Sequence, residues 1–271
     1  MRAPGWESSG VDPADFAHSL CEYMAQASTD YPESFGGSSN APHPLRPLPL
    51  LELGYESVLS DVRIAAGGST ACIGVASASG VLDVANLGDS GYAHLSPFRL
   101  NAVSAAQTHA FNTPFQLSKV PRRLAEQAQL FGGVPLQDYP SDSALSTARL
   151  RHGDVLVFAS DGVWDNLSPA DILQTTCRVM VGMKGWVRSK SGEVGVAAEF
   201  ATLALRPSEG EASGLSAMLA SAIAKEAKEA SLDERRDGPF AKEVQKLFPK
   251  EHWRGGKADD VCTVVVVVCQ E

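Results

Sequence analysis

The chain has 271 residues, of which 44% are hydrophobic and 20% charged. This composition is typical of a globular protein with a substantial core, and no apolar run approaches the roughly 18 residues of a membrane-spanning helix. The net charge of -9 argues against non-specific nucleic-acid binding, because that activity needs a basic face for the phosphates.

The cysteines form no C-x-x-C pair, which excludes a zinc ribbon, and their scatter does not suggest a disulfide framework. We expect reduced thiols in an intracellular protein. Two of them lie in apolar runs and are expected to be small core residues. We expect neither a signal peptide nor a transit peptide in residues 1–10, which have no apolar core. The cysteines are Cys21, Cys72, Cys177, Cys262 and Cys269, and those in apolar runs are Cys72 and Cys262.

The N-terminal part predicts a helix, a loop and a second helix. Pro13 follows a potential N-cap at Asp12, and apolar residues then recur at spacings of three and four, which predicts a helix of about four turns. Residues 28–50 are rich in Ser, Gly and Pro and predict an irregular surface loop, with a Pro-rich ligand for a partner domain as the alternative. Residues 51–60 predict a helix.

A meander of strands is expected next. The apolar runs 71–76 and 81–87 are separated by a cluster of small residues and predict an antiparallel hairpin, followed by a strand over 91–95. Gly67 and Gly68 precede the first strand, but no Gly-Lys-Ser/Thr follows them. The sequence therefore predicts close backbone packing there and no nucleotide-binding loop.

The middle of the chain, residues 109–147, is predicted to form a loop, a short helix and a second loop. Residues 109–118 predict a loop, 121–131 a short helix, and 132–147 an exposed acidic loop. His109 is a candidate general acid or metal ligand, although a single histidine without a partner more often serves packing or lies at the surface.

The run from Val155 to Asp165, VLVFASDGVWD, predicts a buried strand that ends on a carboxylate, Asp161. A strand followed by an Asp-Gly turn would explain this stretch alone. However, a second apolar strand ends on Gly88 and Asp89. Asp259 and Asp260 then precede a third strand. Three strands would thus bring a carboxylate to one edge of a sheet, where each needs a cation, a donor or solvent beside it.

The C-terminal half predicts helices that cover a sheet, followed by a last strand. Helices are expected from Pro169 onwards, over 194–205, over 215–230 and over 240–248. Five consecutive valines, Val264 to Val268, cannot alternate between a polar and an apolar face, so both faces of this strand are expected to be buried at the centre of a sheet.

Four segments resemble, in order, the motifs of the metal-dependent Ser/Thr protein phosphatases, the PPM or type 2C group. They lie between Gly67 and Cys269 and read GSTACIGV, ANLGDSGY, FASDGVWDN and GGKADDVCTVVVV. Residues 109–118, HAFNTPFQLS, resemble the short branch typified by mitochondrial phosphatases.

The resemblance implies an α+β fold for residues 1–271 as a single PPM-type domain. In this fold two antiparallel sheets are flanked by helices in a four-layer α-β-β-α sandwich. Family members carry upstream strands with an Asp-Gly pair whose carboxylate bridges two metal ions. No residue of this chain matches that pair, so we expect the domain to lack its first strands and half of its metal site.

The implied activity is hydrolysis of phosphoserine and phosphothreonine through a metal-activated water, with no side chain assigned as a direct catalyst. Hard oxygen ligands without a His or Cys cluster select Mg²⁺ or Mn²⁺, and the resemblance implies two or more such ions. By resemblance, Asp161 and Asp259 match ligands of a catalytic metal, and Asp89 matches a ligand of a third, weaker ion. Asp260 is the alternative to Asp259, because Cys262 adds a residue to the family's usual spacing.

A competing hypothesis is an inactive pseudophosphatase that binds phosphoproteins or acts as a regulatory module, which the missing half-site favours. In either case the expected partner is a phosphoprotein, and the chain is expected to be a monomer with no transmembrane segment and no nucleic-acid partner. The branch resemblance implies a mitochondrial location, with the cytoplasm as the alternative.

Overall fold

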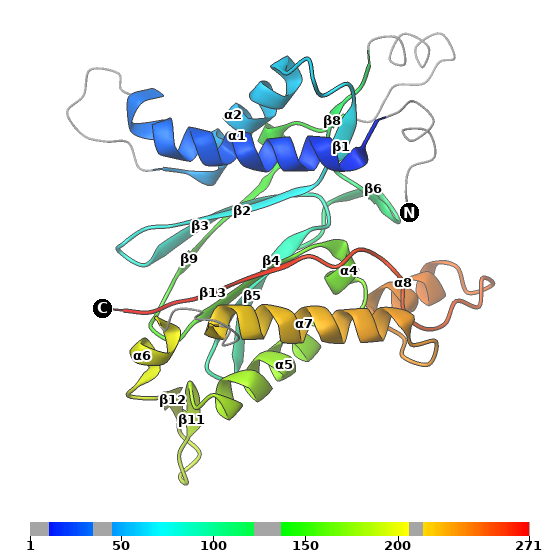
Figure 1. Ribbon diagram of the computed structural model, residues 1–271. Helices are drawn as coiled ribbons and strands as arrows, with labels where there is room; N and C mark the ends of the chain where they lie inside the picture. The colour runs from blue at the N-terminus through cyan, green and yellow to red at the C-terminus, as the bar shows by residue number, and fades with distance from the viewer. Residues whose placement is uncertain (1–10, 35–44, 122–136, 206–213, 271) are drawn as a thin grey trace. The chain divides into compact units, whose positions relative to one another are not determined.

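Helices and antiparallel sheets make up the computed structural model, which describes residues 11–34, 45–121, 137–205 and 214–270 (Figure 1). The chain divides into two units, each assembled from two separate stretches: unit 1 comprises 1–88 and 106–148, and unit 2 comprises 89–105 and 149–271. Each unit combines sheet and helix, which confirms the α+β class. The single domain and the stacking of four layers stay predictions.

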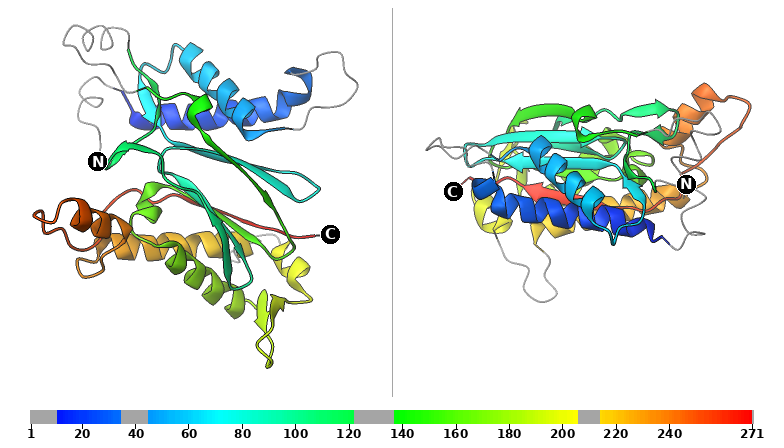
Figure 2. Two further views of the ribbon diagram at one scale, coloured as in Figure 1. Left: turned by 180° about the vertical axis from the view of Figure 1, so that it is seen from behind. Right: turned by 90° about the horizontal axis from the view of Figure 1, so that it is seen from above.

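The described residues of unit 1 form helices α1 and α2, a three-stranded sheet of order β2-β3-β9 and the small pairs β1-β8 and β6-β7. Helices α1 and α2 pack against each other and cover the apolar face of β2 and β3 (Figures 1 and 2). The elements are α1 (Pro13–Ser34), α2 (Pro47–Ser60), β1 (Gly67–Ser69), β2 (Ala71–Ala76), β3 (Val81–Leu87), β6 (Thr108–Ala110), β7 (Thr113–Pro114), β8 (Leu117–Lys119), a 3₁₀ turn (Pro140–Asp142) and β9 (Ala144–Arg149).

The core of unit 1 explains why α1 and α2 form where they do. Pro13 and Pro47 each occupy the first turn of a helix, where the missing N–H costs nothing. Phe16 of α1 and Tyr55 of α2 meet edge to face in the buried cluster, with ring centroids 6.4 Å apart. The Tyr55 hydroxyl donates a hydrogen bond of 2.7 Å to the carbonyl of Ser118, so the aromatic pair is fixed at both ends.

Unit 2 contains a four-stranded antiparallel sheet of order β13-β10-β4-β5. Helices α5 and α7 pack on this sheet and on each other. The elements are β4 (Gly91–Ser96), β5 (Arg99–Val103), β10 (Val155–Ala159), α4 (Asp161–Trp164), α5 (Pro169–Gly182), β11 (Trp186–Arg188), β12 (Val194–Val196), α6 (Phe200–Ala204), α7 (Leu215–Leu232), α8 (Pro239–Leu247) and β13 (Thr263–Val267).

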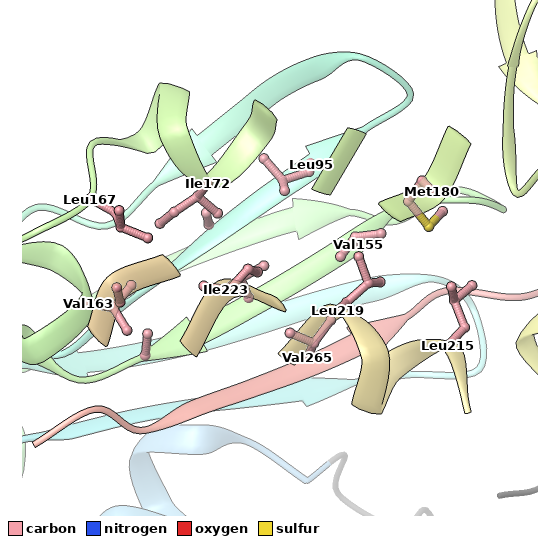
Figure 3. Close-up of a cluster of buried hydrophobic side chains, with 14 of the residues drawn as sticks. Leu95, Val155, Val163, Leu167, Ile172, Met180, Leu215, Leu219, Ile223 and Val265 are labelled. Atoms are coloured by element: carbon pink, nitrogen blue, oxygen red, sulfur yellow. The ribbon is translucent and has the colours of Figure 1, made fainter. Parts of the chain in front are cut away.

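Alternating residues of the sheet meet the helices in a single apolar core. Val155 and Val265 point from adjacent strands towards Leu219 and Ile223 of α7, while Ile172 of α5 closes the same cluster (Figure 3). Neighbouring strands of this sheet are antiparallel, and β10 is aligned residue by residue with both β4 and β13 from Val155 to Ala159. None of the helices in the described part of the chain is long and apolar enough to cross a membrane.

Most strand and helix predictions are confirmed, but several boundaries were wrong. The predicted loop 28–50 overlaps two helices, because α1 continues to Ser34 and α2 begins at Pro47. Packing between these helices outweighs the weak helix propensity of Ser, Thr and Pro. The helix predicted over 121–131 lies almost wholly outside the described residues.

Three further expectations need correction. The predicted loop 109–118 overlaps β6, β7 and β8, and the described part of the predicted loop 132–147, residues 137–147, overlaps β9; the mostly exposed side chains of these strands leave no hydrophobic alternation to detect. The predicted helix 194–205 is a short strand followed by one turn and a half of helix. Cys262 is exposed outside β13, so it is not a core residue.

The five-valine strand is not central. β13 forms an edge of its sheet, and Val265 is buried whereas Val264 and Val266 are 55% and 43% exposed. The strand does alternate between an inner and an outer face, but valine on both faces conceals this in the sequence.

Candidate metal centre

The register of the unit 2 sheet places the C-terminal end of β10 beside the N-terminal ends of β4 and β13, and we call this end of the strands the edge that carries the site. Ala159, the last residue of β10, lies opposite both Gly91, the first aligned residue of β4, and Thr263, the first residue of β13. The segments that follow β10 and precede the other two strands must therefore meet. Asp161 follows β10, and Asp259 precedes β13, so both enter this edge as the sequence predicted.

The two loops at this edge are held together by backbone contacts. The hydroxyl of Ser160 accepts a 3.0 Å hydrogen bond from the amide of Cys262, and the Ser160 amide donates to the Cys262 carbonyl at 3.1 Å. A β-carbon on Gly162 would lie 2.3 Å from the carbonyl oxygen of Asp260. Only glycine allows this approach, which explains why the Asp161-Gly162 pair begins α4.

Three carboxylates converge at the edge. Asp161, Asp165 and Asp259 each offer an oxygen, and these ligand atoms lie within 4.8 Å of one another. Asp161 and Asp165 are four residues apart at the two ends of α4, so one helical turn places both on the same face. The third carboxylate comes from the segment before β13.

An ammonium group lies among these carboxylates. The Nζ atom of Lys257 is 2.5 Å from Asp165 Oδ2, 3.4 Å from Asp161 Oδ2 and 3.2 Å from Asp259 Oδ2, and its side chain is only 11% exposed. Burial acts to lower the pKa of Lys257, but the hydrogen bond and charge of Asp165 and the charge of Asp161 outweigh it and raise that pKa.

One ammonium does not balance the negative charge of the site. Burial raises the pKa of Asp165, although Lys257 opposes this effect, and the charge of Asp161 adds to the rise. In Asp259, burial is outweighed by the amide of Asp260 and by Lys257, so its pKa is lowered. The buried Asp259 Oδ2 faces the ammonium of Lys257 at 3.2 Å. Clustered oxygen ligands with surplus charge fit a hard divalent cation.

The other two predicted metal ligands stand apart from this cluster. Asp89 is not among the three converging residues, but burial and then the charges of Asp161 and Asp165 raise its pKa to about 6. It therefore experiences the electrostatic field of the cluster. Asp260 is exposed, and its carbonyl accepts a hydrogen bond from Ser160 at 3.2 Å.

Two residues of the cluster were not assigned to it from the sequence. Asp165 was given no role from the sequence, and its i, i+4 spacing from Asp161 is the signal that could have identified it. Lys257 was not considered as a site residue, although it precedes Asp259 by only two positions. A cation in an acidic loop becomes informative only once the distances are known.

His109, the histidine candidate, lies in unit 1 and has a partner. Its Nε2 is 2.9 Å from Asp138 Oδ1, and its ring stacks on Phe115 at 4.2 Å. The Asp138 carboxylate also accepts a 2.8 Å hydrogen bond from the amide of Gln116. These contacts account for His109 as a packing and bridging residue of its own unit.

Comparison with known proteins finds relatives among the type 2C phosphatases. The chain is 27% identical over 264 residues to protein phosphatase 2C homolog 7, mitochondrial, of Saccharomyces cerevisiae, a match that covers 97% of this chain and 67% of the relative. It is 34% identical over 174 residues to the human protein phosphatase PTC7 homolog, covering 63% of this chain and 51% of that protein. The chain thus spans about half the length of the human relative.

The fold is similar to that of the photosystem II phosphatase PBCP, with a TM-score of 0.65 and 21% identity over 97% of this chain and 82% of that one. No model of a protein family matches the chain. The resemblance to the metal-dependent type 2C phosphatases that the four motifs carry is confirmed by these relatives.

Proposed function

We propose that this chain is a metal-dependent protein phosphatase that hydrolyses phosphoserine and phosphothreonine in phosphoproteins. The observation that carries the proposal is the convergence of Asp161, Asp165 and Asp259 around one point at the edge of the unit 2 sheet. The names of the yeast and human relatives support the same activity.

The three aspartates would hold Mg²⁺ or Mn²⁺, since each presents a carboxylate oxygen to the shared point and the set contains no histidine or cysteine. A divalent cation bound there supplies a Lewis acid, which lowers the pKa of a water molecule and offsets charge on a phosphoryl group. Asp89 would contribute to a further, weaker ion, because burial and the neighbouring carboxylates already disfavour its negative charge.

Lys257 must move when a cation enters, because its ammonium lies among the same three carboxylates. Phe240 offers it an alternative place: the Nζ atom already lies 4.9 Å from the centroid of that ring, where a cation is attracted to the aromatic face. From there the ammonium would remain close enough to the centre to attract the phosphoryl group of a substrate.

We do not retain the binding-only alternative, since nothing in the chain's relatives favours it and three carboxylates of the centre are assembled. The name of the yeast relative supports a mitochondrial location for this chain, which we propose together with the activity.

Phosphatase activity is tested with p-nitrophenyl phosphate and with a phosphoserine peptide, each with millimolar Mn²⁺ or Mg²⁺ and with a chelator. We expect cation-dependent turnover that Asp161→Asn reduces by about a hundredfold or more, because a carboxylate ligand is lost. Glu243→Gln, a change at a half-exposed carboxylate of α8, serves as the matched control. Turnover that persists in chelator or in Asp161→Asn would exclude this centre as its source.

A further inference from the structure

A pocket of about 460 Å³ lies in unit 2 beside the C-terminal end of α8. It is lined by polar, aromatic and basic side chains, and two neighbouring apolar residues, Leu247 and Phe248, are 46% and 44% exposed. Such a combination of exposed apolar surface and polar groups is typical of a binding site for a peptide. The lining residues are Gln245, Pro249, His252, Trp253 and Arg254.

One carboxylate organises the walls of this pocket. Asp237 accepts hydrogen bonds from Arg254 Nη1 at 2.8 Å, from the amide of Gly255 at 2.8 Å and from Gln245 Nε2 at 3.0 Å. His252 adopts a left-handed backbone conformation with φ of 51°, which is uncommon for a residue with a side chain. The loop therefore holds a fixed shape that its own local preferences do not explain.

The same loop connects the pocket with the metal centre. The Trp253 ring packs edge to face on Phe240 with centroids 5.4 Å apart. Lys257, whose Nζ contacts the aspartates, has this atom 4.9 Å from the centroid of the same ring. Between them, Gly256 runs so close to α7 that a β-carbon would lie 2.1 Å from the carbonyl oxygen of Ala230. The ring of Phe240 thus contacts both Trp253 of the pocket and Lys257 of the metal centre.

The surroundings of the pocket are basic, although the chain as a whole carries a net charge of -9. Lys246 and Lys250 are exposed and adjoin lining residues in the sequence, and Arg254 is itself 74% exposed. Arg254 pairs with Asp237 at 2.8 Å and Lys246 with Glu243 at 3.4 Å, so Lys242 and Lys250 against Glu251 leave a small excess of positive charge between 237 and 254. A basic neighbourhood on an acidic protein favours an acidic ligand.

We propose that this pocket binds the acidic residues that flank the phosphorylated residue of a phosphoprotein substrate. Lys250 and Arg254 would attract the carboxylates, and the exposed face of Trp253 would cover the aliphatic part of the peptide. The Trp253 ring centroid and Lys257 Nζ lie 5.4 and 4.9 Å from the centroid of Phe240, so about three residues of an extended peptide, which advances about 3.3 Å per residue, would cover this path. The proposal rests on the proposed function and names the substrate class of the same centre.

Binding is measured first, by fluorescence anisotropy of a labelled acidic peptide and of a neutral peptide of equal length in metal-free buffer. Neither peptide is phosphorylated, so the readout does not depend on catalysis. We expect the acidic peptide to bind at least fivefold more tightly, with a preference that weakens as salt is added. Equal affinities for the two peptides would overturn the proposal.

Variants then locate the binding site. Lys250→Gln combined with Arg254→Gln is expected to remove most of the preference, and Lys246→Gln combined with Lys250→Gln, which leaves the bonds of Asp237 intact, is expected to reduce it in the same direction. Lys190→Gln, in the exposed turn between β11 and β12, combined with Lys225→Gln on the exposed side of α7, removes the same two charges elsewhere and serves as the control. If both double variants bind like the control, the pocket is not the binding site.

Kinetics separate this proposal from the proposed function. Without cation-dependent turnover of p-nitrophenyl phosphate the phosphatase proposal fails, whereas the binding preference is read independently. With turnover, kcat/KM for an acidic phosphoserine peptide should exceed that for a neutral one by about fivefold, and the Lys250 and Arg254 double variant should abolish this ratio. A ratio near one in the unmodified chain would overturn the pocket proposal alone.

Discussion

Lys257 and Asp165 form the closest contact of the candidate metal centre, with Nζ and Oδ2 2.5 Å apart. Asp161 and Asp259 lie on the same ammonium at 3.4 and 3.2 Å. In this arrangement a side chain of the protein itself supplies positive charge to the three carboxylates. A metal ion and Lys257 compete for the same carboxylates, and this competition can be measured.

Replacing Lys257 with Met keeps the length of the side chain and removes its charge. We expect at least fivefold tighter Mn²⁺ binding by calorimetry, because no ammonium has to be displaced. Without metal, the free energy of unfolding should fall by about 2 kcal/mol, since three carboxylates then lose their cation. Lys246→Met, at an exposed pair with Glu243, is the control and should change neither quantity appreciably. Unchanged Mn²⁺ affinity in Lys257→Met would show that the lysine does not compete.

Replacing Asp161 with Asn should weaken Mn²⁺ binding by about tenfold or more, because one anionic ligand becomes a neutral amide. The change also lowers the repulsion among the carboxylates, so the metal-free protein should not lose stability. Calorimetry measures the Mn²⁺ affinity, and thermal unfolding in the presence of a chelator measures the stability of the metal-free protein. Binding equal to that of the unmodified chain would remove Asp161 from the centre, and Glu243→Gln again controls for the loss of a carboxylate elsewhere.

Because the Cys72 thiol is buried, the stability of the protein should depend on pH in the alkaline range. Burial raises the pKa of its thiol to about 12 from an ordinary value of 9.0. Unfolding releases a thiol that ionises more easily, so this contribution to stability is complete below about pH 9 and is lost as the pH rises towards 12. Urea unfolding between pH 8 and 11 should show a flatter dependence for Cys72→Ala than for the unmodified chain. Parallel curves for the two proteins would contradict this assignment.

The same burial predicts low thiol reactivity. At pH 8, Cys72 should react with iodoacetamide at least tenfold more slowly than the exposed Cys262, because the thiolate is the reacting form. Mass spectrometry of tryptic peptides over time distinguishes the two sites, and the urea-unfolded chain, in which both should react alike, is the control. Equal rates in the folded chain would place Cys72 in an exposed setting.

The outer face of β13 predicts self-association. Val264 and Val266 are 55% and 43% exposed on an edge strand without a charged residue between Thr263 and Val267. An edge of this kind pairs readily with other chains. Val266→Lys should therefore lower concentration-dependent light scattering and the binding of a hydrophobic dye. Val265→Lys, which places the charge in the buried core, should instead unfold the protein. Equal scattering by Val266→Lys and the unmodified chain would contradict the prediction.

Local patterns were sufficient for the elements that position the centre. The apolar run of β10 ending on Asp161, and the helix that Pro169 begins, follow directly from hydrophobic spacing and capping chemistry. Ser168 and Asp171 form a reciprocal capping box at that helix, which is a purely local signal. The four ordered motifs added the phosphatase resemblance, which relatives confirm.

Sequence patterns gave wrong predictions for segments whose structure depends on the strand or helix that packs beside them. β9 is almost wholly exposed and has no apolar alternation, yet it forms a strand because β3 supplies its hydrogen bonds. In β13, valine on both faces conceals which one is buried, and the packing of α7 against the face that carries Val265 decides it.

Local patterns in the sequence were enough to place aspartates next to three strands and to indicate oxygen ligands at that end of the sheet. Which of these aspartates meet depends on how the strands pack: Asp161 and Asp259 converge with Asp165, whereas Asp260 is exposed. The same packing places Lys257 among them. The physical reason is that capping, turn and strand propensities act over a few residues, whereas a charge cluster depends on distances of 2.5 to 3.4 Å between segments about ninety residues apart, which only the packed sheet can fix.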